Sequence, residues 1–449
     1  MSKTVDMTHG SATKHILSFA FPLLLTNLGQ QLYMIVDAAI VGRGVGMNAL
    51  AAVGATDWTY WLLFWTVIGL TQGFSTFISR CFGDKNFPAM NKVIAQSTVL
   101  CAVFGILFTV TGIAAALPIL NLLQTPADIL DSAHTYLVTM VSGILVVTAY
   151  NMASAILRAL GDGKTPLIAM VIAAFLNIGL DCLFVFVFHW GIFGAAIASV
   201  LAQLVSFLYC LSRIYSIDCI RIDRDMWKPD WHLVKQMLLF SIPICLQNMI
   251  ISIGGILLQS SVNLQGSTFI AGYTATNKIF GLFEASGLSL GLAAATFLGQ
   301  NYGARMYMRV KQGVKTATII AIIAGILVSV LIYLFRYPLL QCFLDVSEPG
   351  GTEALAIAVR YLIIMILFLI ILYLIHVFRN ALQAIAVSFW CMLSGIAECI
   401  CRVFMAKVVI HWMGSDALFV SEPLAWLAAM LCVMLPYLCY YRRKRLKAI

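Results

Sequence analysis

Long runs of apolar residues constrain this chain more than any other feature of its sequence. Reading for stretches of about 20 residues with few charges, we find twelve that could each cross a bilayer. Hydrocarbon offers no water to satisfy backbone polar groups, so such runs must be helical. The predicted spans are 16–42, 47–78, 93–120, 133–157, 165–188, 191–212, 237–262, 268–299, 313–340, 354–378, 385–410 and 419–441.

Composition supports a polytopic membrane protein. The chain is 61% hydrophobic and only 10% charged, whereas soluble domains carry roughly 25% charged residues. The first fifteen residues are polar and lack the apolar core of a signal peptide, so we expect the first run to be a true span. The twelve cysteines are scattered singly with no C-x-x-C, which predicts neither disulfides nor a structural metal.

The basic residues predict which side of the membrane each loop faces. Most Lys and Arg residues fall in the same set of alternate loops as the N-terminus, including Arg379 and the tail "RRKRLK", while the other loops are acidic. By the positive-inside rule both termini should be cytoplasmic, in the inner cell membrane. We expect the tail to contact anionic lipid headgroups and not nucleic acid.

The second half of the sequence repeats the first at an offset of about 221 positions. This offset places Pro22 on Pro243, Asn177 on Glu398 and Asp181 on Arg402. With an even number of spans in each half, both halves enter the membrane in the same direction. We therefore expect an all-α membrane protein with twelve transmembrane helices, in two six-helix bundles related by a pseudo-twofold along the membrane normal.

A polar, charged segment separates the two halves. We predict an N-terminal six-helix bundle at 1–212, a cytoplasmic linker at 213–236, a C-terminal six-helix bundle at 237–441 and a basic cytoplasmic tail at 442–449. A pair of bundles related in this way encloses a central cleft suited to alternating access.

Two polar residues interrupt the apolar run "AAFLNIGLDCLFVF". Asn177 and Asp181 lie four residues apart and share one face of a helix. A carboxylate in hydrocarbon is costly unless it is paired, hydrated or protonated. From the helical rise, Asp181 and Ser199 lie roughly 12 Å below the outer surface and Asp37 roughly 8 Å. Oxygen-bearing side chains at similar depths suit a small hard cation or a proton.

Several motifs, in this order, resemble the multidrug and toxic compound extrusion (MATE) transporters. They are "VDAAIVGRGVGMNALAAVG" (36–54), "LRALGDGKTP" (157–166), the N-x-x-x-D of the fifth span, "GIFGAAIASVLAQ" (191–203) and "FLGQNYGARMYMRVKQG" (297–313). The resemblance covers essentially the whole chain and implies a secondary transporter.

The resemblance also implies a cation site in the first half. Carried onto this sequence, its positions are Asp37, Asn177, Asp181, Ala195 and Ser199, with Tyr33 and Tyr136 in a supporting network. The implied coupling ion is H⁺ or Na⁺, and Na⁺ at Asp37, Asn177 and Asp181 is the one metal that we expect. Ser199 stands where a threonine is common in the family and keeps the hydroxyl.

Each of these positions also has a purely structural interpretation. Asp181 could pair with a lysine or cap a kink, and Asp37 could be hydrated near the outer surface. Tyr33 and Tyr136 could pack at an interface, where tyrosine is common. An aromatic group of the second span could bind flat organic cations or only pack; it comprises Trp58, Tyr60, Trp61, Phe64 and Trp65.

The second half offers a different set of polar residues. Its carboxylates of interest are Glu284 and Glu398, and we expect Glu398 to form a neutralising ion pair with Arg402 at i, i+4. Glu284 and Lys278 could face the cleft or pair with other spans. Some MATE relatives carry acidic residues in spans 7 and 10, which this sequence lacks. That departure argues against a second-half cation site of that kind.

These observations predict a secondary antiporter that exports organic, cationic drugs or toxins in exchange for H⁺ or Na⁺. We expect a monomer that needs no cofactor besides the coupling ion. The alternative is a flippase for lipid-linked oligosaccharide or another amphiphile, which would need several basic residues in the cleft, where Lys278 and Arg402 are the candidates. An enzyme is not expected, because no catalytic motif is present, and the lack of a P-loop argues against ATP-driven pumping.

Overall fold

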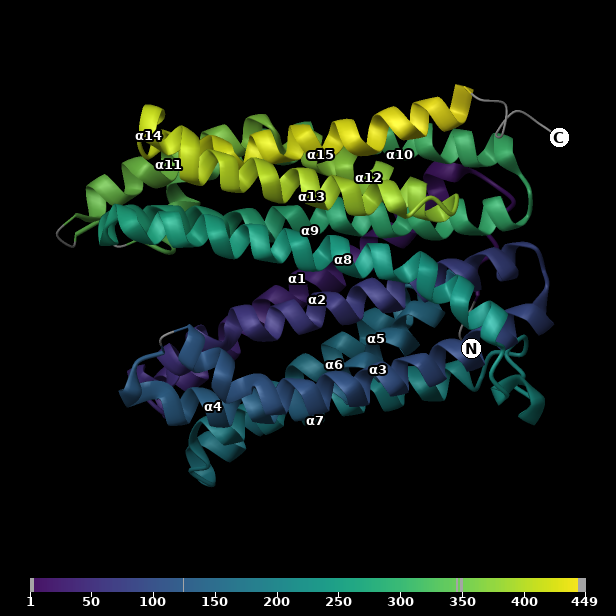
Figure 1. Ribbon diagram of the computed structural model, residues 1–449, viewed down its shortest axis with the longest axis horizontal. Helices are drawn as coiled ribbons and strands as arrows, with labels where there is room; N and C mark the ends of the chain where they lie inside the picture. The colour runs from purple at the N-terminus through teal and green to yellow at the C-terminus, as the bar shows by residue number, and fades with distance from the viewer. Residues whose placement is uncertain (1–3, 124, 345, 348–349, 443–449) are drawn as a thin grey trace. The chain divides into compact units, whose positions relative to one another are not determined.

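The computed structural model describes residues 4–123, 125–344, 346–347 and 350–442, which are almost entirely helical and contain no strand (Figure 1). In the first half the elements are α1 (Ala12–Gly44), α2 (Met47–Gly83), α3 (Phe87–Leu122), α4 (Ala127–Ser142), α5 (Ile144–Ala159), α6 (Lys164–Asp181), the π-helical η1 (Cys182–Val187), α7 (Gly191–Ile214) and the short η2 (Arg224–Trp227). The predicted all-α fold is confirmed.

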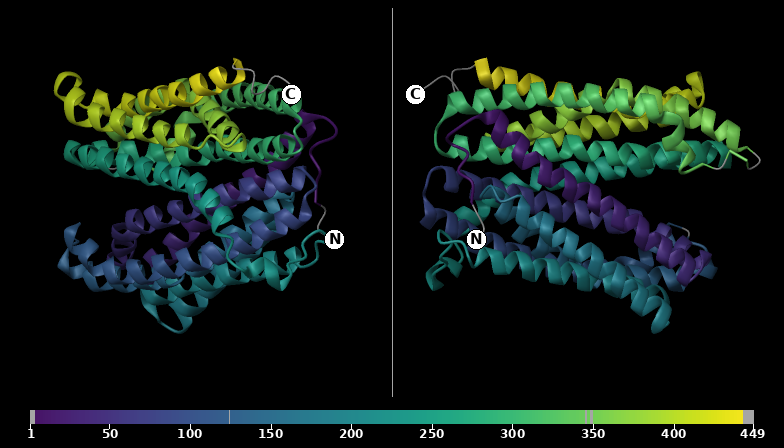
Figure 2. Two further views of the ribbon diagram at one scale, coloured as in Figure 1. Left: turned by 45° about the vertical axis from the view of Figure 1, so that its right-hand side comes forward. Right: turned by 180° about the vertical axis from the view of Figure 1, so that it is seen from behind.

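The second half has a similar series of elements. They are α8 (Trp231–Val262), the short η3 (Asn263–Gln265), α9 (Ser267–Gly303), α10 (Tyr307–Gln341), α11 (Gly351–Leu367), α12 (Leu369–Ala384), α13 (Phe389–Phe404), the π-helical η4 (Met405–Val409), α14 (Ile410–Met413) and α15 (Asp416–Arg442). Within each half the long helices run lengthwise beside one another (Figures 1 and 2).

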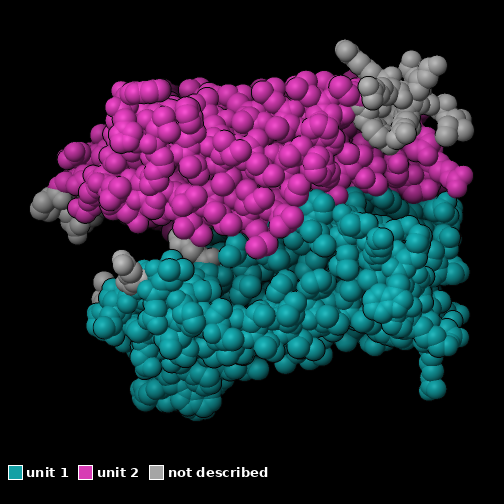
Figure 3. Space-filling model, in the orientation of Figure 1, with its two compact units in different colours: residues 1–7, 21–245 teal, residues 8–20, 246–449 magenta. Residues whose placement is uncertain are grey.

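The chain divides into two compact units, residues 1–7 with 21–245 (unit 1) and residues 8–20 with 246–449 (unit 2) (Figure 3). The division cuts two continuous helices, α1 after Ala20 and α8 after Cys245. The predicted start of the second bundle at residue 237 thus lies inside α8, ahead of the division. The reason is local packing: a Cβ at Gly73 of α2 would clash with Ser241, so the first part of α8 lies directly against unit 1.

Most of the predicted spans correspond to long helices. Within the described part of the chain, nine helices are long and apolar enough to cross a membrane, and two bent pairs raise the number to eleven. The bent pairs are α4 with α5, at 42°, and α11 with α12, at 47°. The eleventh predicted span, 385–410, is the one left out of this number: it contains α13, whose 16 residues are fewer than the roughly 20 that a straight span needs. This segment continues through η4 and α14.

The sequence duplication is visible in the backbone of each unit taken by itself. Gly46 before α2 and Gly266 before α9 both have positive φ, at 118° and 92°. Lys85 follows the end of α2 and Arg305 follows the end of α9. Their φ angles are 56° and 58°, a left-handed conformation that is uncommon outside glycine. Each unit also contains one bent helix pair and one π-helical segment. These paired irregularities support a common ancestral half.

The linker predicted at 213–236 is fixed to unit 1 by polar side chains of α3. Gln96 donates to the carbonyls of Met226 and Lys228 at 2.8 and 3.0 Å, and it accepts from the Asp230 amide at 3.3 Å. Asn91 donates to the Cys219 carbonyl at 3.2 Å. The linker is therefore an ordered part of the first unit and not a loose tether.

Side-chain packing in unit 1 joins α2, α3, α5, α7 and α8. Phe74, Ile94, Leu157 and Cys210 are buried in one cluster. Because lipid tails are as apolar as these side chains, close van der Waals packing, and not hydrophobic burial, holds such helices together.

Candidate cation-binding site

The helix that carries Asn177 and Asp181 begins at a capped turn. Asp162 Oδ1 accepts from the amides of Lys164 and Thr165 at 3.1 and 3.0 Å, and its Oδ2 accepts from Thr165 Oγ1 at 2.6 Å. A side-chain cap of this kind satisfies amides that an N-terminus leaves free. It fixes the start of α6, and with it the register of the two polar residues near the other end.

Asp181 is the last residue of α6, and the π-helical η1 follows it directly. Both Asn177 and Asp181 are fully buried, at 1% and 0% exposure. A π-helical insertion widens the turn, and such insertions are frequent at functional sites. On the neighbouring helix, Gly194 allows close approach, because a Cβ there would lie 2.9 Å from Phe184 Cβ of η1.

Asn177 and Ser199 are brought together as the sequence predicts. Asn177 Nδ2 donates to Ser199 Oγ over 3.2 Å, from α6 to α7. A second bond joins the same two helices away from this pair, where Ser206 Oγ donates to the Ala169 carbonyl at 2.9 Å. The amide oxygen of Asn177 is left free to face other groups.

Asp37 of α1 lies beside Asp181, close enough for the two carboxyl groups to act on each other. Tyr33, one turn earlier on α1, lies near both aspartates, and Tyr136 of α4 lies near Asp37. The structure therefore gathers Asp37, Tyr33 and Tyr136 with the α6 residues. Asp181 has no lysine partner among the described residues, which argues against one of its structural alternatives, and Asp37 is partly buried, with its Oδ1 inaccessible.

Several oxygen atoms in this cluster lack hydrogen-bond donors. Both carboxylate oxygens of Asp181, Oδ1 of Asn177 and Oδ1 of Asp37 are buried with no hydrogen-bond partner among the described residues. An unpartnered buried acceptor normally costs about 1–3 kcal/mol, and a charged one more. A group of acceptors without donors is chemically matched to a cation or to protons on the carboxyl groups.

Ala195 contributes no polar side-chain atom to the cluster. It is buried one turn before Ser199, in an apolar group with Val41, Tyr136 and Val185. Its side chain thus packs the wall beside the polar residues, and a role as a ligand through its carbonyl stays a prediction.

Two further residues belong to this neighbourhood and are absent from the predicted set. Gln203 lies one turn after Ser199 on α7 and contacts Tyr33, and its Oε1 is a buried acceptor without a donor among the described residues. Tyr60 of α2 lies near Tyr33 and Tyr136. The spacing of Gln203 four residues after Ser199 is the signal that could have identified it.

The aromatic group of α2 packs largely against itself. Trp61 lies edge-on to Phe64, with ring centroids 5.2 Å apart, and Trp65 is 6.3 Å from Trp61. Phe64 also packs against Ile144 and Val147 of α5. The side chain of Trp58 lies outside the described residues. These contacts favour packing over an open aromatic wall.

In unit 2 the predicted ion pair between Glu398 and Arg402 is present, at 3.1 Å. Two residues that were not predicted to take part complete it: Arg379 lies 2.6 Å from Glu398, and Glu422 lies 2.7 Å from Arg402. Arg379, which the sequence assigns to a cytoplasmic segment, lies within the last two turns of α12 and is buried. Glu422 of α15 is a second carboxylate of this network, and the sequence did not predict its part in it.

Glu284 and Lys278 do not join this network. Glu284 Oε1 lies 3.8 Å from His376 Nε2, which makes pairing with another helix the better of the two predicted alternatives. Lys278 is exposed on α9.

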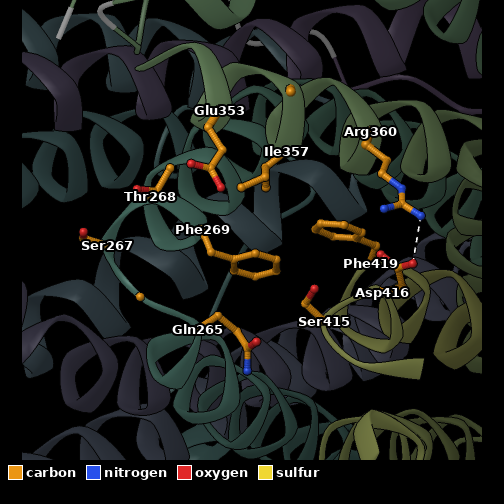
Figure 4. A pocket seen from close by; sticks show the side chains of 12 residues that line it. Gln265, Ser267, Thr268, Phe269, Glu353, Ile357, Arg360, Ser415, Asp416 and Phe419 are labelled. Atoms are coloured by element: carbon orange, nitrogen blue, oxygen red, sulfur yellow. Dashed lines mark hydrogen bonds and ion pairs between the residues drawn. The ribbon is translucent and has the colours of Figure 1, made fainter. Parts of the chain in front are cut away.

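A separate pocket of about 640 Å³ lies among the N-terminal ends of α9 and α15 and the first turns of α11 (Figure 4). Arg360 and Asp416 form an ion pair of 2.8 Å at its edge, and the ring of Phe419 lies below the guanidinium. None of the predicted site residues lines it. This pocket is distinct from the cluster in unit 1.

Long apolar helices, two bent spans and a buried cluster of oxygen acceptors define a multi-pass membrane transporter. The MatE family model matches residues 22–183 and 243–408. The chain belongs to this family of multidrug and toxic compound extrusion transporters, and it is not an enzyme.

Curated relatives match over nearly the full length. A "Probable multidrug resistance protein YpnP" of Bacillus subtilis (strain 168) is 28% identical over 100% of this chain and 98% of its own. A "FAD transporter" of Shewanella oneidensis is 21% identical over 96% of this chain and 94% of its own.

Solved structures share the fold. An outward-facing multidrug resistance MATE family transporter superposes with a TM-score of 0.89 at 23% identity, covering 99% of both chains. A transporter of the same superfamily from Pyrococcus furiosus, reported with a binding pocket of reverse polarity, gives 0.91 at 23% identity and covers 100% of this chain and 99% of its own.

Proposed function

We propose that this MATE transporter is a secondary antiporter that exports small organic cations in exchange for inward H⁺ or Na⁺. The observation that carries the proposal is the group of buried acceptor oxygens on Asp37, Asn177 and Asp181, which has no donor among the described residues. The coupling ion binds there, with Ser199 orienting Asn177. No other cofactor is needed.

The cluster couples ion entry to substrate exit because binding of the ion changes the net charge of the Asp37 and Asp181 carboxyl groups. With the cation bound, the negative charge of the Asp37 and Asp181 carboxyl groups falls by one, so the pair tolerates burial better. After the ion leaves, the same groups are charged and desolvated, which favours a conformation that hydrates them or that accepts a cationic substrate. An ion that binds one conformation better than the other shifts the equilibrium between them. Alternating access then couples ion entry to substrate exit.

The names of several relatives support export of drugs, since YpnP and others are described as multidrug resistance or multidrug export proteins. The cationic character of the substrate is our inference from the carboxylates of the site. The flippase alternative is weaker, because Arg402, one of its two candidate basic residues, pairs with Glu398 and Glu422, which leaves only Lys278. By the distribution of basic residues, the protein resides in the inner cell membrane with both termini cytoplasmic. We expect it to act as a monomer.

Purified protein in proteoliposomes tests the proposal. A pH gradient and a Na⁺ gradient are imposed separately, and ethidium, FAD and a lipid-linked sugar are compared as substrates. We expect uphill ethidium transport with one of the two gradients and no transport of the other two compounds. Ethidium flux that neither gradient drives, or transport of the lipid-linked sugar alone, would contradict the proposal.

A further inference from the structure

The four charged residues of the unit 2 network are arranged around one guanidinium. Arg402 Nη2 donates to Glu398 Oε1 at 3.1 Å and to Glu422 Oε2 at 2.7 Å, and its Nη1 donates to the Ile251 carbonyl of α8 at 3.1 Å. Arg379 binds the other oxygen of Glu398 at 2.6 Å. Two carboxylates and a carbonyl thus surround the Arg402 cation, and with Arg379 the network is electrically balanced.

The residues around Arg402 occupy positions equivalent to those of the unit 1 cluster. Asn177 and Asp181 lie at the end of α6, before η1, and Glu398 and Arg402 lie near the end of α13, before η4. The duplication offset of about 221 places the first pair on the second.

The last helix of each half extends the correspondence. "HW" occurs at 189–190 and at 411–412, and the next glycine in each half, Gly191 or Gly414, has a positive φ of 58° or 61°. Aligning these glycines places "LA" at 201–202 on "LA" at 424–425, and it places Ser199 on Glu422. Asn177, Asp181 and Ser199 therefore each align with a charged residue of unit 2, and those charged residues bind one another.

We infer that Arg402 is a built-in cation: its guanidinium fills, in unit 2, the kind of oxygen site that unit 1 keeps for the coupling ion. Where unit 1 has the carboxylate of Asp181, unit 2 has a fixed positive charge, and Glu398 and Glu422 stand in place of the neutral Asn177 and Ser199. Unit 2 therefore takes no coupling ion, and removing the arginine side chain opens a site for a monovalent cation, best filled by guanidinium. The comparison with unit 1 rests on the proposed function, but the site around Arg402 does not.

Chemical rescue tests this inference without any transport measurement. Thermal unfolding of purified Arg402→Ala is followed in guanidinium chloride up to about 10 mM, far below denaturing concentrations, with choline chloride as the salt control. Breaking a buried pair should lower the melting temperature by about 5–10 °C. We expect guanidinium to restore at least half of this loss in a saturable way, and choline to restore none.

Two further variants act as controls. Arg360→Ala removes an arginine from an exposed ion pair of the same unit, and it should show no response to guanidinium. Arg402→Ala combined with Glu422→Gln leaves the Arg379–Glu398 pair balanced, so it should fold more stably than Arg402→Ala and lose the response.

Three outcomes would overturn the inference: an unchanged melting temperature for Arg402→Ala, an equal response to choline and guanidinium, or a double variant no more stable than the single one. The last comparison decides the matter even when Arg402→Ala alone does not fold. Failure of the proposed antiport would appear in the proteoliposome assay and would leave these melting temperatures unchanged.

Discussion

Asn177 of α6 donates a hydrogen bond to Ser199 of α7 across 3.2 Å, and its amide oxygen is buried without a donor among the described residues. The bond belongs to the proposed ion site, whereas the Ser206–Ala169 bond joins the same helices away from it. The two serines can therefore be used to separate ion binding from helix packing.

Ser199→Ala should weaken coupling more than it weakens folding. Loss of the acceptor frees Asn177 to rotate, so the concentration of ion that gives half-maximal gradient-driven efflux should rise severalfold. The loss of stability should be about 1 kcal/mol. The matched control, Ser206→Ala, should cost a similar amount of stability and leave the ion dependence unchanged. If both variants shift the ion dependence equally, Ser199 acts only through packing.

Asp162→Ala should destabilise unit 1 by removing the cap of α6. The side chain accepts three hydrogen bonds at the start of the helix, and the loss of such a cap costs about 0.5–2 kcal/mol. Asp162→Asn keeps one acceptor oxygen and should fall between the wild type and the alanine variant in a thermal unfolding measurement. Equal melting temperatures for all three proteins would show that the cap does not stabilise α6.

Arg379 and Glu398 should be strongly coupled in a double-mutant cycle. Arg379→Met alone leaves Glu398 short of one partner, and breaking a buried pair costs about 3–5 kcal/mol. Arg379→Met with Glu398→Gln leaves the Arg402–Glu422 pair, at 2.7 Å, in place, so the double change should cost clearly less than the sum of the single changes. Additive losses would mean that the two residues do not stabilise each other.

The linker should be accessible from the cytoplasm. Asp225 is well exposed, so Asp225→Cys, in a background without the exposed Cys182, Cys342 and Cys439, should react with an impermeant maleimide only in inside-out vesicles. Native Cys219 in the same linker is a useful internal comparison, because burial raises the pKa of its thiol and slows its reaction. Labelling of Asp225→Cys from the outside would reverse the proposed orientation.

Much of the fold could be predicted because hydrophobic runs and their repetition are properties of the sequence alone. The runs predicted helices, and the repeated prolines and glycines predicted two similar halves. The bends at Gly143 and Phe368 and the π-helical segments could not be predicted in this way, since they do not change the hydrophobic run in which they lie. The order of the linker could not be predicted either, because its polar sequence is typical of a free loop and its hydrogen bonds come from Gln96 on α3.

The candidate site was predictable where its residues lie on one helix. Asn177 with Asp181, and Glu398 with Arg402, follow from the spacing of four residues along a helix. Arg379 and Glu422 could not be assigned to the network, because nothing in the sequence brings α12, α13 and α15 together at one depth. Arg379 was counted among the basic residues of the loops, and a rule of that kind carries no information about its pairing with Glu398.

Gradient-driven efflux by purified, reconstituted Asp181→Asn is the most direct test of whether Asp181 carries the coupling ion. The substitution keeps the size of the side chain and removes its charge, in a residue that is fully buried with both oxygens unpaired among the described residues. The control, Asp128→Asn, makes the same change at an exposed position at the start of α4. We predict that Asp181→Asn inserts and folds like the wild type but loses efflux driven by the ion gradient, whereas Asp128→Asn keeps it. Efflux by Asp181→Asn at the wild-type rate would contradict the central claim that Asp181 carries the coupling ion.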